Sequence, residues 1–354
     1  MIAMTSDMIG QSYKNILIIR CDRIGDVLLS TPALKCLRDA YPHSRIAVMV
    51  RPYAFDIVYG NPHVDNVIVY DKDGRDNGLL ATIRFTLWLK SQKFDLSVNL
   101  HPTQRTNIIP FLAGIPKRVG YDQKWGFLLT DKVPHTKQFG EKHELEYTLD
   151  LVRSLGIAAL GKSLYMPIAP ESVMRVKDML TAGGIRDTDT VVAVHPGASC
   201  PSKRWPADYF ARLADELIEK MNAKVVIVAG PSDARIGNIA ASFMRNKSLN
   251  LSGETSVADL AALFLRCALF ISNDSGPVHI ASAVDTPVIS IFGRNQPGLG
   301  PKRWGPVGRR DVILQKDVGC KECLAHDCQI DFKCLKALSV DDVFQAARNM
   351  LTAR

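Results

Sequence analysis

The sequence predicts an α/β protein made of two domains, each an open parallel sheet covered by helices on both faces. Short runs rich in Val and Ile alternate throughout with stretches whose apolar residues recur at helical spacing. The length of 354 residues exceeds a usual single core. An extended, Pro-bearing segment, 164–170, interrupts the alternation. We therefore expect an N-terminal domain over 1–168, a C-terminal domain over 169–338, and a helix over 339–354 that could pack back on the N-terminal domain.

The individual elements follow from these patterns in chain order. In the first half we predict strands at 16–19, 46–50, 67–69 and 96–100, and helices at 28–40, 79–89 and 145–155. In the second half we predict strands at 191–194, 225–228, 269–272 and 288–292, and helices at 210–221, 234–244, 257–267, 278–284 and 339–351. Ser339 is a candidate N-cap for the last helix. We expect ligands in a cleft beyond the carboxyl ends of the strands.

Charge and hydropathy limit the class of protein. The net charge is +8, and most of the excess lies in the first half. This suits an anionic partner such as nucleic acid, a phosphorylated glycolipid or a membrane surface, although surplus surface Lys and Arg explain it equally well. No apolar run approaches the roughly 20 residues that span a bilayer. The N-terminus has no secretory signal pattern, so we expect a cytoplasmic protein.

Segment 79–94 mixes Leu, Ile, Phe and Trp with three basic residues. It fits a helix lying at the inner face of the cytoplasmic membrane, and it fits equally well a core helix with basic outer positions.

Four of the eight cysteines lie close together in the sequence, at Cys320, Cys323, Cys328 and Cys334. A Cys-x2-Cys with two further cysteines could bind a metal. The later spacings match no common zinc-finger pattern, so we expect reduced thiols that pack a connecting loop.

The segment 273–281 (NDSGPVHIA) is the most informative motif. It follows an apolar run and precedes a second one, which predicts strand, tight loop, helix and strand. Small residues at Ser275 and Gly276 let a ligand approach the backbone. The amide groups at a helix start attract anions, so the segment predicts a phosphorylated ligand.

Two other segments follow predicted strands. Segment 20–26 (RCDRIGD) ends in Asp26, which could be a general base for an acceptor hydroxyl or simply an N-cap. Segment 195–206 holds small residues at Gly197 and Ser199, followed by Lys203 and Arg204, which could neutralise a diphosphate or simply be solvated.

Together these segments resemble glycosyltransferase family 9, the ADP-heptose:lipopolysaccharide heptosyltransferases. The resemblance covers about residues 15–351 and depends on the order and spacing of its motifs. They are RCDRIGD at 20–26 with TPAL at 31–34, HPG at 195–197 with KRWP at 203–206, AGP at 229–231, and NDSGPVHIA at 273–281.

The resemblance implies a GT-B fold of two Rossmann-like domains facing each other, and a metal-independent, inverting transfer of heptose from ADP-heptose to the lipopolysaccharide inner core. It implies no cofactor and no nucleic-acid partner, with the acceptor held by the first domain and the donor by the second. The matching catalytic residues are Asp26 as the base and Lys203 as the cation at the donor phosphates. The matching donor residues are Gly197, Ser199, Arg204, Asp233, Asp274, Ser275, Gly276 and His279.

The acceptor side is less direct. His101, Arg105 and Arg118 follow or flank strands of the first domain and could bind acidic sugars or phosphates. The alternatives are a related enzyme with another nucleotide-sugar or glycan acceptor, and a nucleotide-binding protein without turnover. Peripheral contact with the inner membrane surface is a further expectation.

Overall fold

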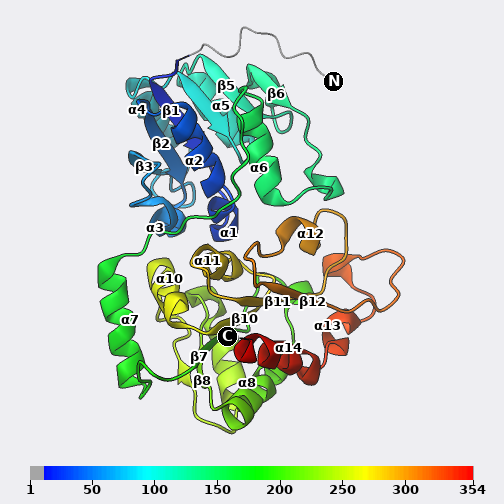
Figure 1. Cartoon of the computed structure of the whole chain (residues 1–354). Coiled ribbons are helices and arrows are strands. Elements are labelled where there is room, and N and C mark those ends of the chain that lie inside the picture. Colours follow the sequence, from blue (N-terminus) through cyan, green and yellow to red (C-terminus); the bar gives the residue numbers. More distant parts are fainter. Residues whose placement is uncertain (1–11, 354) are drawn as a thin grey trace. The chain divides into compact units, whose positions relative to one another are not determined.

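A computed structural model of the chain describes residues 12–353 (Figure 1). The chain divides into two compact units. Among the described residues, the first comprises 12–137 and 142–167, and the second comprises 138–141 and 168–353. The boundary after Pro167 therefore falls inside the Pro-bearing segment identified in the sequence.

The first unit contains a six-stranded parallel sheet in the order β3-β2-β1-β4-β5-β6. Its strands are β1 Asn15–Ile19, β2 Arg45–Val50, β3 Asn66–Val69, β4 Leu96–Asn99, β5 Lys117–Tyr121 and β6 Asp131–Val133. β1 lies between β2 and β4, with Ile18 opposite both Val48 and Val98. The apolar side chains of β1 are fully buried, as expected for a parallel strand covered on both faces.

Helices connect these strands. They are α1 Ile24–Leu28, α2 Thr31–Ala40, α3 Phe55–Val58, α4 Leu79–Ser91, α5 Gln104–Leu112 and α6 Glu144–Arg153. α4 and α5 pack on the same part of the sheet, where Phe85, Leu89 and Ile109 join Leu17 and Ile19 in one buried cluster.

The second unit repeats this topology, with strand order β12-β11-β10-β7-β8-β9. Its strands are β7 Val191–His195, β8 Lys224–Ile227, β9 Leu249–Asn250, β10 Leu269–Asn273, β11 Val288–Phe292 and β12 Val312–Gln315. Its helices are α7 Pro170–Ala182, α8 Ala207–Met221, α9 Ala234–Phe243, α10 Val257–Arg266, α11 Pro277–Ala283, α12 Pro301–Trp304, α13 Lys333–Ala337 and α14 Val340–Thr352. Both sheets have the strand order of a doubly wound Rossmann sheet, so the predicted fold class is confirmed.

The last helix, α14, belongs to the second unit. Val343, Phe344 and Ala347 are buried in the same core cluster as Val192 of β7 and Leu213 of α8. The apolar side of α14 therefore packs within the core of the second unit, against α8. Ser339 is its N-cap, and its hydroxyl accepts a hydrogen bond from the Asp342 amide, as the sequence predicted.

No helix within residues 12–353 is both long and apolar enough to cross a bilayer.

Candidate functional site

The predicted motifs gather at the switch point of each sheet, where the strand order reverses. In the first unit this point lies between β1 and β4, and in the second between β7 and β10. Crossovers leave such a pair of strands in opposite directions, which opens a crevice at their carboxyl ends. The loop with Asp26 follows β1, whereas the loops with Gly197 and Asp274 follow β7 and β10. We describe the two as the β1/β4 site and the β7/β10 site.

Arg20 is the centre of the β1/β4 site. It is 1% exposed, and its guanidinium contacts three carboxylates. Nε lies 3.0 Å from Oδ1 of Asp22, and Nη2 lies 2.8 Å from Oδ1 of Asp26 and 3.1 Å from Oε1 of Glu144. Nη1 donates to the carbonyl of Leu100, just past β4, at 2.7 Å. Arg20 therefore links the carboxyl ends of β1 and β4 to the three carboxylates.

Asp26 lies in the first turn of α1, behind the N-cap residue Arg23. Its role is therefore not that of a helix N-cap, which the sequence left open. Its side chain is 14% exposed, so the carboxylate stays reachable while Arg20 fixes one of its oxygens. A partly exposed, oriented carboxylate at a crevice can accept a proton from a bound hydroxyl.

Burial disfavours charge in this site, and the opposite charges offset it. Burial lowers the pKa of the Arg20 guanidinium, but the three carboxylates outweigh it and raise that pKa. Burial raises the pKa of the Asp22 carboxyl well above its usual range, although the charge of Arg20 opposes this. Burial therefore favours the neutral form of the Asp22 carboxyl, in spite of its 3.0 Å contact with Arg20.

Sequence reasoning missed two members of this site. Nζ of Lys137 lies 2.6 Å from Oε1 of Glu144, and both side chains are buried. Glu144 is the first residue of α6 and lies more than a hundred residues after Arg20 in the chain. The local sequence pattern therefore does not predict their contact.

Burial, together with the positive charges of Arg20 and Lys137, lowers the pKa of His101 to about 4. His101 therefore belongs electrostatically to this site and is neutral at pH 7.

The other two acceptor candidates have other partners than the Arg20 cluster in the printed contacts of their guanidinium groups. Nη1 of Arg105, on α5, donates to the carbonyl of Lys72 at 3.5 Å. Arg118 lies at the amino end of β5, whereas the switch-point crevice lies at the carboxyl ends of the strands. Its Nε donates to the carbonyl of Leu128 at 2.8 Å, and its guanidinium lies over the ring of Phe111. The structure thus gives Arg118 a packing role at the end of α5.

The β7/β10 site contains two cations that share one carboxylate. Nζ of Lys203 lies 2.8 Å from Oδ2 of Asp274, and Nη2 of Arg294 lies 3.2 Å from the same oxygen. The side chain of Lys203 is 13% exposed, whereas those of Asp274 and Arg294 are 7% exposed. The three groups carry a net charge of +1 in a largely desolvated place, which favours an anion. The sequence analysis missed Arg294, although this residue, like the predicted ones, lies just past a strand, β11.

Asn273 holds the loops of this site together. Its amide Nδ2 donates to the carbonyls of Pro196 at 2.9 Å and Gly197 at 3.3 Å, and its Oδ1 accepts from the backbone N–H of Trp205 at 2.9 Å. Asn273 is fully buried at the end of β10. One side chain therefore fixes the loop after β7 and the turn that carries Lys203.

We expect Asn273→Ala to lower the free energy of unfolding by at least about 2 kcal/mol, because the buried N–H of Trp205 and the buried carbonyls of Pro196 and Gly197 lose this partner. Urea unfolding of the whole chain measures this. Asn349→Ala, at an exposed position on α14, is the matched control and should leave the unfolding midpoint unchanged. Equal midpoints for Asn273→Ala and the native chain would show that the loops are held by other contacts.

The remaining predicted donor residues surround these loops. Oγ of Ser275 lies 3.3 Å from Nδ1 of His195 and 2.9 Å from Oγ of Ser272, and burial lowers the pKa of His195 to about 4. Gly276 is half-buried directly before α11, and His279 is buried within that helix. The predicted order of strand, loop, helix and strand around this motif is confirmed.

Gly197 packs directly against Asp233. A Cβ on Gly197 would come within 2.9 Å of the Asp233 Cβ, so only glycine fits there. Nη2 of Arg204 lies 3.8 Å from Oδ1 of Asp233, and Nε of Arg204 donates to the carbonyl of Ala198 at 2.9 Å. Burial raises the pKa of Asp233, and Arg204 opposes this. Gly197, Arg204 and Asp233 thus form one wall, while Ser199 is exposed in the same loop.

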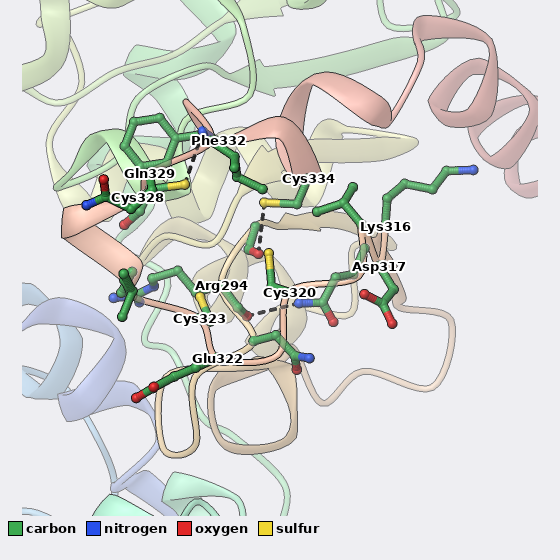
Figure 2. A pocket seen from close by; sticks show the side chains of 18 residues that line it. Arg294, Lys316, Asp317, Cys320, Glu322, Cys323, Cys328, Gln329, Phe332 and Cys334 are labelled. Carbon is green, nitrogen blue, oxygen red and sulfur yellow. Dashed lines mark hydrogen bonds between the residues drawn. The ribbon is translucent and has the colours of Figure 1, made fainter.

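The four clustered cysteines line a cavity of about 290 Å³ in the second unit, which Arg294 of the β7/β10 site also lines (Figure 2). All four are free thiols. Sγ of Cys334 donates to the carbonyl of Gly293 at 3.2 Å, and Sγ of Cys328 accepts from the amide of Phe332 at 3.3 Å. Within residues 12–353, no three His, Cys, Asp or Glu side chains are arranged to hold a metal ion, Cys320 and Cys323 included.

Comparison with known proteins identifies close similarities over nearly the whole chain. The family model described as glycosyltransferase family 9 (heptosyltransferase) matches residues 82–333. The chain is 27% identical over 338 residues to lipopolysaccharide heptosyltransferase 3 of Escherichia coli (strain K12), covering 92% of this chain and 95% of the relative. It is 25% identical over 297 residues to lipopolysaccharide heptosyltransferase 2 of Salmonella typhimurium, covering 81% and 84%.

Solved structures agree. A glycosyl transferase of family 9 from Veillonella parvula superposes with a TM-score of 0.88 at 26% identity, covering 98% of this chain and 99% of that one. An E. coli heptosyltransferase solved with ADP-2-deoxy-2-fluoro heptose gives a TM-score of 0.70 at 17% identity, covering 95% and 99%. The second likeness shows the fold alone, and with the two six-stranded sheets it supports the GT-B class.

Proposed function

Since the chain belongs to glycosyltransferase family 9, the heptosyltransferase family, and is a glycosyltransferase, we propose that it transfers heptose from ADP-heptose to the core of a lipopolysaccharide acceptor. The observation that carries the proposal is the β7/β10 site. There Lys203 and Arg294 share the single carboxylate of Asp274 beside the small-residue loop at Ser275 and Gly276. The relatives named as lipopolysaccharide heptosyltransferases support the sugar and the acceptor class.

The donor side follows from charge. A nucleoside diphosphate gathers negative charge as it leaves the sugar, and fixed cations in a desolvated place stabilise that charge without rearranging. Lys203 and Arg294 supply net positive charge for this purpose in a metal-independent reaction. Gly197 leaves room for the side chain of Asp233, which is the candidate for the ribose hydroxyls.

The acceptor side follows from the β1/β4 site. Asp26 removes the proton from the acceptor hydroxyl as that oxygen attacks the anomeric carbon, and ADP leaves from the opposite face, so the anomeric configuration inverts. Arg20 orients the Asp26 carboxylate through the 2.8 Å contact. Neutral His101 is the candidate hydrogen-bonding partner for the acceptor.

The direct test is incubation of the purified chain with ADP-heptose and lipopolysaccharide acceptors truncated at successive core positions, followed by mass spectrometry. A mass increase of one heptose on one acceptor is the expected result. If no acceptor gains mass while ADP still binds, the chain is a nucleotide-binding protein without this turnover.

Donor choice has its own test. We expect ADP at about 100 times its dissociation constant to stabilise the fold by ~2.7 kcal/mol, and UDP to do so much less at the same concentration. A thermal-shift titration with both nucleotides measures this. Stabilisation by UDP and not by ADP would indicate a GT-B enzyme with a different nucleotide-sugar.

A further inference from the structure

Helix α4 is labelled in Figure 1 and packs on the sheet of the first unit. Apolar side chains occupy both of its faces, although only one face is covered. Phe85 and Leu89 are buried against the sheet. Leu80 is 83% exposed and Leu87 is 62% exposed. A surface helix ordinarily carries polar residues on its outer side. The outer side of α4 is therefore an apolar surface without a cover in the isolated unit.

We call this surface the α4 outer face; its members are Leu79, Leu80, Ile83, Leu87 and Trp88, all exposed. The i, i+3 and i+4 spacings from Leu80 through Ile83 to Leu87 place these side chains in one stripe. The ring of Trp88 packs on Phe85 with centroids 5.5 Å apart, yet 43% of the residue stays exposed. A tryptophan held at the border of an apolar stripe is typical of a helix at a lipid–water boundary.

Basic side chains accompany this stripe. Arg84 and Lys90 lie on the exposed side of α4, and Lys93 follows the helix, also exposed. Residues 77–121 contain six basic residues and a single acidic one, Asp95. The carboxylate of Asp95 accepts hydrogen bonds from the backbone N–H groups of Lys14 at 2.7 Å and Asn15 at 3.2 Å. Six positive charges against one negative charge leave this stretch with a net charge of +5.

The acidic loop before α4 is largely neutralised by its own contacts. Asp73 pairs with Arg51 at 2.5 Å, and Asp76 pairs with Arg75 at 3.0 Å. Lys72 lies in the same loop, so that Arg51, Lys72 and Arg75 together balance the charges of its three aspartates. The field around the α4 outer face is therefore positive.

We propose that the α4 outer face docks on a lipid leaflet that carries anionic lipid. Aliphatic side chains insert among the acyl chains, and the flanking Arg and Lys contact the phosphates. The basic residues beside the α4 outer face are complementary in charge to anionic headgroups. A second copy of the same face would bring like charges together, because no acidic residues lie among these basic ones. The inference deepens the proposed function, on which it rests, because a lipid-anchored acceptor is presented at such a leaflet.

The test is flotation of the full chain with phosphatidylcholine vesicles, with and without phosphatidylglycerol. We expect the native chain to float with the anionic vesicles and to bind neutral vesicles at least ten times more weakly. Leu80→Gln/Leu87→Gln should lower anionic binding at least tenfold. Leu160→Gln/Leu265→Gln removes two exposed leucines elsewhere and is the matched control, which should bind as the native chain does. Circular dichroism and thermal unfolding verify that all variants fold.

A second variant isolates the electrostatic part. Arg84→Gln/Lys90→Gln/Lys93→Gln should bind anionic vesicles only as weakly as the native chain binds neutral ones. Native fluorescence should shift to the blue on binding, and Trp88→Phe should lose most of that shift. Absence of binding to anionic vesicles, or full binding by Leu80→Gln/Leu87→Gln, overturns the proposal. A concentration-dependent dimer that this variant abolishes would assign the face to a second copy instead and also overturns it.

Transfer to a delipidated oligosaccharide acceptor separates this inference from the proposed function. Leu80→Gln/Leu87→Gln should keep the native rate on that soluble acceptor and lose rate on acceptor embedded in vesicles. If the native chain fails on the soluble acceptor but still floats with anionic vesicles, the proposed function fails while the docking surface stands.

Discussion

Asp26→Asn is expected to lower kcat for sugar transfer by about 10²–10⁴-fold, the usual contribution of a general base, while the affinity for ADP stays unchanged. The amide cannot take the proton of the acceptor hydroxyl. It has the same shape as the carboxylate, and its oxygen can still accept the hydrogen bond that Arg20 donates at 2.8 Å. The change therefore removes the proton acceptor and keeps a partner for the guanidinium. Steady-state kinetics with saturating ADP-heptose and acceptor measure kcat, and calorimetric titration measures ADP binding.

Asp39→Asn is the matched control, because Asp39 is exposed on α2 and pairs only at the surface with Lys35. It should leave kcat unchanged. A native kcat for Asp26→Asn would falsify the base assignment. Asp22→Asn would then test the other aspartate on Arg20, whose raised pKa makes it a weaker candidate for a carboxylate ionised at neutral pH.

Most of the fold could be predicted because buried parallel strands are long apolar runs. β1, β2, β10 and β11 are such runs and were found. The missed strands are the short or polar ones towards the sheet edges, β5, β6, β9 and β12. β6 has three residues and β9 has two, so their periodicity carries no signal. α5 was missed because Pro110 lies inside it and argues against a helix.

The site was predicted to the extent that its residues lie just past strands. Asp26, Gly197 and Asp274 were found in this way, because the carboxyl ends of parallel strands meet at one edge. Glu144 was missed because its contact with Arg20 joins segments far apart in the chain, and Lys137 was missed because it joins the site through Glu144. Asn273 is part of the quoted motif but was given no role. From the sequence alone, a buried asparagine that links two loops cannot be distinguished from any other polar residue after a strand. The sequence does not reveal which end of a strand a flanking residue occupies, and Arg118 lies at the amino end of β5.

Lys203→Ala is expected to reduce kcat by about 10²–10³-fold, the usual cost of losing one preorganised group that stabilises developing charge. In the native chain two cations share the carboxylate of Asp274, so the cluster carries +1. Without Lys203, Asp274 and Arg294 neutralise each other, and no net charge remains for the leaving diphosphate. Lys177→Ala, at an exposed position on α7, changes the net charge of the chain equally and should leave kcat unchanged.

The charge argument makes a sharper prediction for a double variant. Lys203→Ala/Asp274→Asn restores +1 to the cluster, because Arg294 no longer faces a carboxylate. If net charge at the diphosphate is what Lys203 supplies, the double variant should transfer sugar faster than Lys203→Ala alone and bind ADP more tightly. If Lys203 acts by a directed contact with one phosphate oxygen, Asp274→Asn will give no recovery, since Arg294 reaches the carboxylate from another strand end. Kinetics and ADP titration on both variants, with thermal unfolding to verify their folds, decide between a diffuse field and a specific contact as the source of leaving-group stabilisation.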